Sequence, residues 1–66
     1  MKISVNGNER EVPEGTTIAQ LIEQLALKTD RIATERNLSV VPKAKYAETQ
    51  LADGDKLEIV TFVGGR

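Results

Sequence analysis

Apolar and polar residues alternate at the start of the chain, which is the pattern of a half-buried β-strand. Lys2-Ile3-Ser4-Val5 forms the first run and Glu9-Arg10-Glu11-Val12 the second, with Asn6-Gly7 between them. Asn-Gly is the dipeptide favoured in a type I′ hairpin turn. These residues predict an N-terminal β-hairpin, and Pro13-Glu14-Gly15 ends it because proline cannot donate a ladder hydrogen bond.

The next apolar residues recur with the period of a helix. Thr17 and Gln20 fit a capping box, in which each side chain bonds the backbone N–H of the other residue. The apolar stripe follows at i, i+3, i+4 and i+7: Ile18, Leu21, Ile22 and Leu25. We expect this stripe to pack on a sheet. A partner-binding helix is disfavoured because the chain has no other long apolar face to cover the sheet.

Extended patterns return after the helix. Residues 31–36 predict a third strand, residues 37–39 a turn, and residues 40–42 a short extended piece that ends at a proline. Residues 43–51 predict an irregular helical turn. Its inward-facing side chains would be Tyr46, Ala47 and Leu51.

The last predicted strand covers residues 56–62, after a turn at residues 52–55. Alternation places Leu57, Ile59 and Thr61 on one face and Glu58, Val60 and Phe62 on the other. The whole order favours an α+β fold, a mixed four- to five-stranded sheet with one main helix packed on one face. The first and last strands should lie side by side in the middle, and Val60 and Phe62 should be exposed on the open face as candidates for partner binding.

The amino-acid composition argues against several classes of function. The 66 residues include nine basic and ten acidic side chains, a net charge of -1, so no basic field exists to hold nucleic acid. No apolar run approaches the roughly 18 residues of a membrane span, and the N-terminus lacks a signal-peptide core, so a cytoplasmic protein is expected. The chain has no Cys and no His, hence no thiolate, no imidazole base and none of the usual soft metal ligands. Side-chain catalysis is therefore not expected.

Two side-chain groups invite a functional interpretation. Asp53-Gly54-Asp55 could suggest calcium, but it lacks the further spaced ligands of a calcium loop, and a turn is favoured. Lys43 and Lys45 with Tyr46 form a small basic and aromatic group, which is too small for a nucleic-acid footprint. The two lysines could keep the surface soluble or meet an acidic rim on a partner.

The last residues of the chain suggest that its own main chain could be the reacting group. The last strand runs into Val63-Gly64-Gly65-Arg66, and two glycines in succession can pass through a gap that excludes other residues. The stretch from Val63 to Gly65 would reach about 10 Å when extended. We predict a domain at residues 1–62 and a flexible diglycine tail at residues 63–66. The alternative is a frayed end without a role.

Motifs spread over nearly the whole chain resemble the ThiS family, the sulfur carrier proteins of thiamine biosynthesis. They are Asn6-Gly7, Pro13-Glu14-Gly15-Thr16-Thr17 with Leu21-Ile22, Val40-Val41-Pro42, Tyr46-Ala47-Glu48-Thr49, Leu51-Ala52-Asp53-Gly54-Asp55 and the ending from Ile59-Val60 to Gly64-Gly65. The resemblance implies the ubiquitin-like β-grasp fold. It also implies a protein that is a co-substrate carrying sulfur, not an enzyme.

In the family, an E1-like adenylyltransferase (ThiF-like) uses ATP and magnesium to adenylate the C-terminal glycine. The glycine becomes a thiocarboxylate, with sulfur drawn from cysteine through a cysteine desulfurase, and thiazole synthase (ThiG-like) receives the sulfur. On this chain the resemblance implies Gly65 as the modified residue, with Gly64 and Val63 as the tail leading to it. No cofactor would be bound by the chain itself.

Arg66 departs from the family pattern, which ends at the second glycine. While Arg66 is attached, the Gly65 carbonyl is held in an amide and cannot be adenylated. The chain could be a precursor that loses Arg66, Arg66 could be an added remnant, or this copy could be inactive; we favour the trimmed precursor.

Besides a sulfur carrier of thiamine biosynthesis, which is the first class of function, two other classes share these features. A related β-grasp carrier could deliver sulfur to molybdopterin or another acceptor, or could be attached to lysines as a modifier. A β-grasp interaction module with an incidental tail is the third class. Recovery of thiazole synthase, as opposed to a molybdopterin synthase subunit, would separate the first two.

Overall fold

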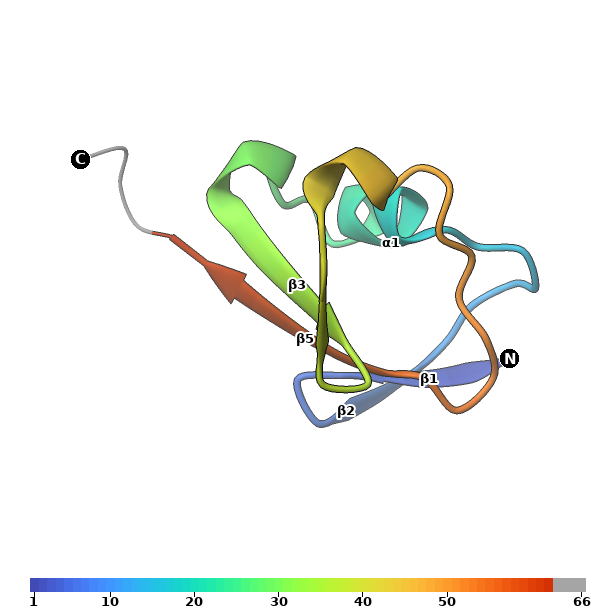
Figure 1. Ribbon diagram of the computed structural model, residues 1–66. Coiled ribbons are helices and arrows are strands. Elements are labelled where there is room, and N and C mark those ends of the chain that lie inside the picture. The colour runs from blue at the N-terminus through green and yellow to red at the C-terminus, as the bar shows by residue number, and fades with distance from the viewer. Residues whose placement is uncertain (63–66) are drawn as a thin grey trace.

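The computed structural model describes residues 1–62, so the predicted tail at residues 63–66 lies outside the described residues. In chain order the elements are β1 (Lys2–Val5), β2 (Asn8–Glu11), α1 (Ile18–Gln24), η1 (Thr29–Arg31), β3 (Ile32–Arg36), β4 (Ser39–Val41), η2 (Lys43–Lys45) and β5 (Lys56–Thr61), where η marks a short 3₁₀ helix. The strands form one five-stranded sheet, and α1 lies across one of its faces (Figure 1). The predicted α+β architecture is confirmed.

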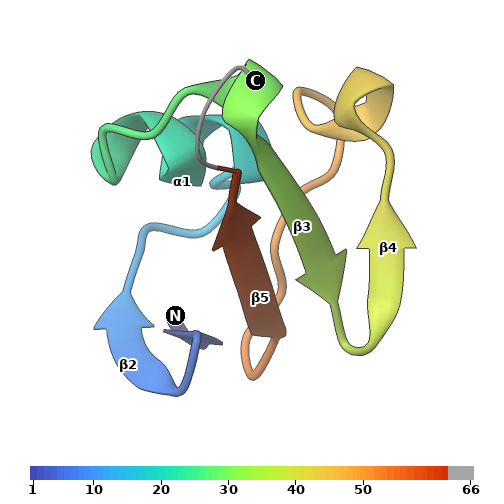
Figure 2. The ribbon, with the colours of Figure 1, turned by 90° about the vertical axis from the view of Figure 1, so that its left-hand side faces the viewer.

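The strand order in the sheet is β2-β1-β5-β3-β4, and the neighbouring strands β5, β3 and β4 are seen side by side in Figure 2. β1 and β5 run parallel, with Ser4 opposite Lys56 and Val5 opposite Leu57. All other neighbours are antiparallel. The first and last strands therefore do lie side by side in the middle, and β5 is held by hydrogen bonds along both of its edges.

A tight turn joins the two strands of each β-hairpin, β1 with β2 and β3 with β4. Asn6 and Gly7 both have positive φ, 51° and 85°, as a type I′ turn requires, and the predicted first hairpin is confirmed. The turn predicted at residues 37–39 is also present. It centres on Asn37 and Leu38, whose φ values of 51° and 73° are again both positive. Leucine rarely occupies this left-handed region.

α1 begins and packs as its sequence predicts. The Thr17 hydroxyl accepts a hydrogen bond from the Gln20 backbone N–H at 3.2 Å, and the Gln20 side-chain oxygen accepts one from the Thr17 N–H at 3.0 Å. The helix buries its stripe against the sheet, and Leu25 is half-buried. The core cluster consists of Ile3, Val5, Val12, Ile18, Leu21, Ile22, Ile32, Tyr46, Leu51, Leu57 and Ile59.

One inward-facing residue was predicted wrongly. Tyr46 and Leu51 are buried as expected, but Ala47 is exposed. The backbone here turns with i to i+3 hydrogen bonds, such as Glu48 N–H to the Lys45 carbonyl at 3.1 Å. About three residues complete such a turn, so the side chain after Tyr46 is rotated away from the core.

Candidate functional site

The predicted site lies at the end of β5. Val63, Gly64, Gly65 and Arg66 fall outside the described residues, so their predicted roles stay predictions. The strand that leads to them is well anchored. Residues 57–61 of β5 pair with residues 32–36 of β3, and the Phe62 N–H continues this pairing by donating to the Arg31 carbonyl at 2.7 Å. The pairing therefore holds the backbone in place up to the residue before the predicted tail.

The second part of the candidate site is the sheet face opposite α1, which we call the open face. Alternation along β5 puts Leu57 and Ile59 in the core and Glu58 and Val60 on the open face. Val60 is 56% exposed and Phe62 is 53% exposed. The prediction that these two side chains would be exposed is confirmed, while their predicted role in partner binding stays a prediction.

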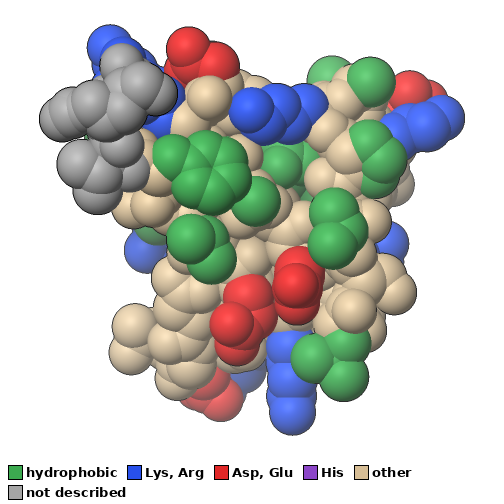
Figure 3. Space-filling view, turned by 60° about the vertical axis from the view of Figure 1, so that its left-hand side comes forward, with side chains coloured by type: hydrophobic (Ala, Val, Ile, Leu, Met, Phe, Trp, Pro, Cys, Tyr) green, Lys and Arg blue, Asp and Glu red, His purple; other side chains and the backbone are tan. Residues whose placement is uncertain are grey.

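The sheet register adds an acidic pair that sequence reasoning missed. Glu35 of β3 lies directly opposite Glu58 of β5, and Val40 of β4 lies directly opposite Glu35 on its other side. Figure 3 shows acidic side chains next to one another on one side of the molecule, with separate hydrophobic side chains above and beside them and a Lys or Arg side chain directly below. The sequence placed Glu58 on this face, but nothing in it gave the register that brings Glu35 across from it.

The hairpin between β3 and β4 extends the apolar part of this surface. Val40 is 70% exposed, and Leu38 at the tip of the hairpin is 89% exposed. Solitary exposed apolar residues are common on proteins. Here, however, four large ones are exposed on the half of the sheet formed by β5, β3 and β4. They are Val60 in β5, Phe62 directly after it, Val40 in β4 and Leu38 in the turn between β3 and β4. The arrangement is suited to contact with another protein.

Asp55 fixes the other end of β5. Its Oδ2 accepts hydrogen bonds from Arg36 Nε and the Ala52 N–H, both at 2.8 Å, and its Oδ1 accepts one from Asn37 Nδ2 at 3.1 Å. Burial raises the pKa of the Asp55 carboxyl. The three hydrogen bonds and the charge of Arg36 lower it by more, so this pKa lies below its ordinary value. Asp55 therefore links the turn before β5 to the hairpin between β3 and β4.

The Asp53-Gly54-Asp55 segment is a turn, as predicted. Asp53 Oδ1 accepts a hydrogen bond from the Lys2 N–H at 2.7 Å, and the Gly54 N–H donates to the Lys2 carbonyl at the same distance. The carboxylates of Asp53 and Asp55 therefore accept hydrogen bonds from donors within the protein. Within residues 1–62, no group of three or more possible ligand side chains is placed to hold a metal ion.

The group of Lys43, Lys45 and Tyr46 does not form a basic and aromatic surface. Tyr46 is only 3% exposed and belongs to the core, while both lysines point to solvent. Lys45 pairs with Glu48 at 3.9 Å.

In the described part of the chain, no helix is both long enough and apolar enough to cross a bilayer.

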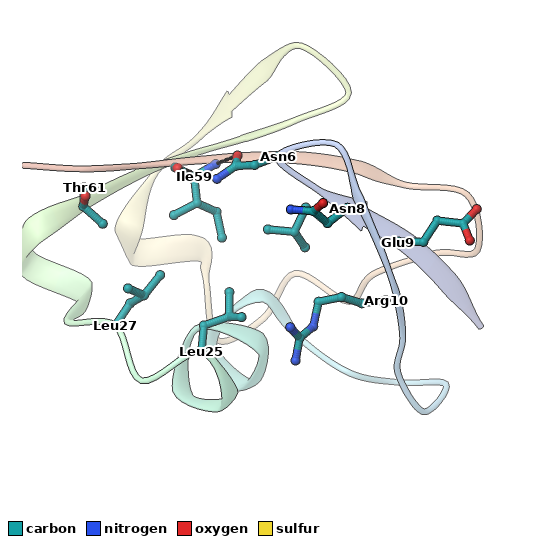
Figure 4. A pocket seen from close by; sticks show the side chains of 9 residues that line it. Asn6, Asn8, Glu9, Arg10, Leu25, Leu27, Ile59 and Thr61 are labelled. Atoms are coloured by element: carbon teal, nitrogen blue, oxygen red, sulfur yellow. Dashed lines mark hydrogen bonds between the residues drawn. The ribbon is translucent and has the colours of Figure 1, made fainter.

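A groove of about 410 Å³ opens between the C-terminal end of α1 and the first hairpin (Figure 4). The helix ends after Gln24, and Ala26, with a φ of 60°, turns the chain between Leu25 and Leu27, which both line the groove. Leu25, Leu27 and Ile59 form apolar walls, and Asn6, Asn8, Glu9, Arg10, Thr61 and Val5 complete the lining. With neither cysteine nor histidine in the chain, this groove offers binding groups but no strong nucleophile.

Comparison with known proteins gives a consistent result. The ThiS family model matches residues 3–65. A sulfur carrier protein ThiS of Bacillus subtilis is 36% identical over 64 residues, which is 96% of this chain and 97% of that protein. The crystal structure of the thiamine biosynthesis protein ThiS from Geobacter metallireducens matches with a TM-score of 0.84 and 28% identity over 100% of both chains. The predicted ubiquitin-like β-grasp fold is thereby confirmed.

Longer proteins also contain a similar segment. A thiazole synthase of Paramagnetospirillum magneticum is 46% identical over 65 residues, and one of Magnetococcus marinus is 37% identical over 65 residues. The chain spans only 20% of the length of each of these two proteins.

Proposed function

Because this chain belongs to the ThiS family, we propose that it is a sulfur carrier protein of thiamine biosynthesis and that the reacting group is its own main chain at Gly65. The observation that carries the proposal is the extent of the family match, which runs through residue 65, the second of the two consecutive glycines. The absence of Cys and His in the sequence agrees with a protein that is transformed by other enzymes and has no turnover of its own.

The proposed chemistry begins with removal of whatever follows Gly65, which is Arg66 in this chain. An E1-like adenylyltransferase then joins the freed carboxylate to the AMP part of ATP, with magnesium, and pyrophosphate leaves. A carboxylate resists nucleophiles, whereas the acyl-adenylate has AMP as a good leaving group. A cysteine desulfurase forms a persulfide from cysteine, and the outer sulfur of this persulfide attacks the acyl-adenylate and displaces AMP. A thiol then cleaves the resulting acyl disulfide, which releases a disulfide and leaves the thiocarboxylate at Gly65.

Delivery requires the tail to enter a partner while the domain stays outside. Gly64 and Gly65 have no side chains, which suits passage through a narrow channel, and Val63 connects them to β5. We propose thiazole synthase as the recipient, because two relatives of that name contain a segment similar to 98% of this chain. Val60 and Phe62 on the open face would contact the partner next to the entry point. A cytoplasmic location fits these partners.

The test is a reconstituted reaction read by intact-protein mass spectrometry. The chain ending at Gly65, the full chain and a Gly65→Ala variant are each incubated with the E1-like enzyme, ATP, magnesium and a sulfide source. We expect a mass gain of one sulfur-for-oxygen exchange on the chain ending at Gly65 only. The full chain should react only after loss of Arg66, and the alanine variant should react far more slowly, since an added methyl group obstructs a tight channel.

A reaction without ATP is the matched control, because it contains every protein and the same sulfide. If the chain ending at Gly65 stays at its original mass with an E1-like enzyme that is active on another ThiS protein, the proposed chemistry is wrong for this chain.

A further inference from the structure

The acidic pair on the open face is unfavourable for the isolated domain. Glu35 and Glu58 are directly opposite each other on antiparallel strands, and like charges in this position destabilise a sheet. The ion pairs found among residues 1–62 are Arg36 with Asp55 and Lys45 with Glu48, so neither Glu35 nor Glu58 has a cation within ion-pair distance there. Glu58 is exposed and Glu35 is half-buried, so this unfavourable pairing is accessible to a partner and calls for a functional explanation.

Two cationic side chains lie close to the acidic pair in the sequence, but neither is within ion-pair distance of it. Arg36 follows Glu35 directly, but its Nε donates to Asp55 Oδ2 at 2.8 Å. Lys56 lies on the same face as Glu58, two residues before it, without reaching ion-pair distance. The acidic pair therefore remains available to a cation from outside the domain.

Leu38 is a second unfavourable feature of the same surface. Its φ of 73° is in the left-handed region that leucine rarely adopts, and its side chain is 89% exposed. The equivalent position of the first hairpin holds Gly7, which adopts a φ of 85° without steric cost. A glycine would suit the Leu38 turn better, so the leucine side chain is better explained by a contact outside the domain.

We propose that Glu35 and Glu58 together bind a lysine or arginine side chain of thiazole synthase, and that Leu38 and Val40 pack on apolar partner residues next to it. The inference rests on the proposed function, since it names the chemistry by which the open face recognises that partner. Two negative charges side by side complement one cation, and an arginine can donate to both carboxylates at once. Val60 and Phe62 continue the contact from this pair toward the tail, so one partner surface can hold the face and receive Gly65.

The test compares stability with affinity in the same variants. Glu35→Gln and Glu58→Gln are combined in one chain, and Glu14→Gln with Glu23→Gln in a control chain that loses the same charge on exposed side chains off the open face. Thermal unfolding gives the midpoint, and calorimetric titration with thiazole synthase of the same organism gives Kd at low and high salt.

The expected results differ between the two chains. The open-face variant should unfold at the same or a higher temperature, because it loses a repulsion. Its Kd for thiazole synthase should rise about tenfold or more, since the coupling energies of close charge pairs at interfaces correspond to at least such a change in Kd. Its Kd should also depend less on salt. The control chain should keep the wild-type Kd and salt dependence.

Leu38→Gly gives the second hairpin the same Asn-Gly dipeptide as the first, and it tests the apolar part. We expect an unfolding temperature no lower than that of the wild type and a Kd raised severalfold. A lower unfolding temperature for Leu38→Gly would contradict the assignment of strain to that turn, and an unchanged Kd would remove it from the interface.

The outcomes separate this inference from the proposed function. If the wild-type chain is thiocarboxylated and binds thiazole synthase while the open-face variant binds equally well, the acidic pair has no such role and the proposed function stands. If the wild-type chain does not bind thiazole synthase at all, this inference and the proposed recipient are both wrong, and the mass measurement still decides separately whether Gly65 carries sulfur.

Discussion

Asp55→Asn perturbs the best-defined polar anchor of the domain. An asparagine at this position can turn its one side-chain oxygen toward Arg36 and Ala52, the two donors that Oδ2 accepts from. Its NH₂ group then faces Asn37 Nδ2, another donor, so that hydrogen bond is lost. The Asp55 side chain is 6% exposed, so water cannot readily replace the lost partner.

The expected destabilisation follows from these contacts. The lost hydrogen bond contributes about 1 kcal/mol, and the lost charge on the bond to Arg36 about 1 kcal/mol more, a modest value because Arg36 is 31% exposed. The sum of about 2 kcal/mol is a large part of the roughly 3–10 kcal/mol that a domain of this size has in total. Urea titration followed by circular dichroism should show the unfolding midpoint falling by about 2 M, for a slope of about 1 kcal/mol/M.

The pH dependence of stability provides an independent check. The folded-state pKa of Asp55 is lowered, so its contribution is complete above the unfolded-state value of about 4 and is lost as pH falls through the lower folded-state value. The wild-type chain should therefore lose more stability than Asp55→Asn when the pH is lowered from about 5 to about 2.

Asp53→Asn is the matched control for this prediction. It is the same change in the same turn, but Asp53 accepts its hydrogen bond from the Lys2 N–H at an exposed site, and an asparagine oxygen can do the same. We expect a change below about 0.5 kcal/mol. If Asp55→Asn and Asp53→Asn cost the same, or if the two chains lose stability in parallel at low pH, the assignment of Asp55 as the anchor is refuted.

Three further stability predictions concern buried or capping polar groups. Thr34→Val should raise the free energy of unfolding by about 1 kcal/mol, because the Thr34 hydroxyl is buried without a hydrogen-bond partner among residues 1–62; a lower urea midpoint would contradict this. Asn6→Ala should lower it by about 2 kcal/mol, since the Asn6 amide makes two hydrogen bonds to the Ile59 backbone, at 2.8 and 3.0 Å; hydrogen exchange should show the Ile59 N–H losing protection, and unchanged exchange would count against it. Thr17→Ala should cost about 1 kcal/mol by removing the cap of α1, and Thr17→Ser should restore most of the loss; equal stability of all three chains would show that the cap contributes nothing.

The elements of the fold could be predicted because their signals are local. The Asn6-Gly7 turn and the capping box that begins at Thr17 each depend on residues close together in the sequence. Alternation along β5 was enough to place Val60 on the open face and to predict that Phe62, directly after the strand, is exposed. The placement of the first and last strands in the middle followed from their apolar composition.

The features that depend on tertiary contacts were not predicted. Glu35 meets Glu58 only through the register between β3 and β5, which no local pattern determines. The sequence identified Asp55 only as part of a turn. Its role as an anchor was missed because its hydrogen-bond partners Arg36 and Asn37 belong to a hairpin that is distant in the sequence. Ala47 was placed wrongly because an irregular segment follows neither the helix period nor the strand period, so its packing direction depends on the local hydrogen bonds.

The central claim is that this domain presents its own main-chain end, at Gly65, as the group that carries sulfur. Mass spectrometry of the protein purified from its own host, with fragmentation of its C-terminal peptide, tests this claim most directly. The account predicts a population that ends at Gly65 and carries one sulfur in place of one carboxylate oxygen, and whose proportion falls when the E1-like enzyme is deleted. A population in which every chain retains residues beyond Gly65, or in which no chain contains the added sulfur during thiamine starvation, would contradict it.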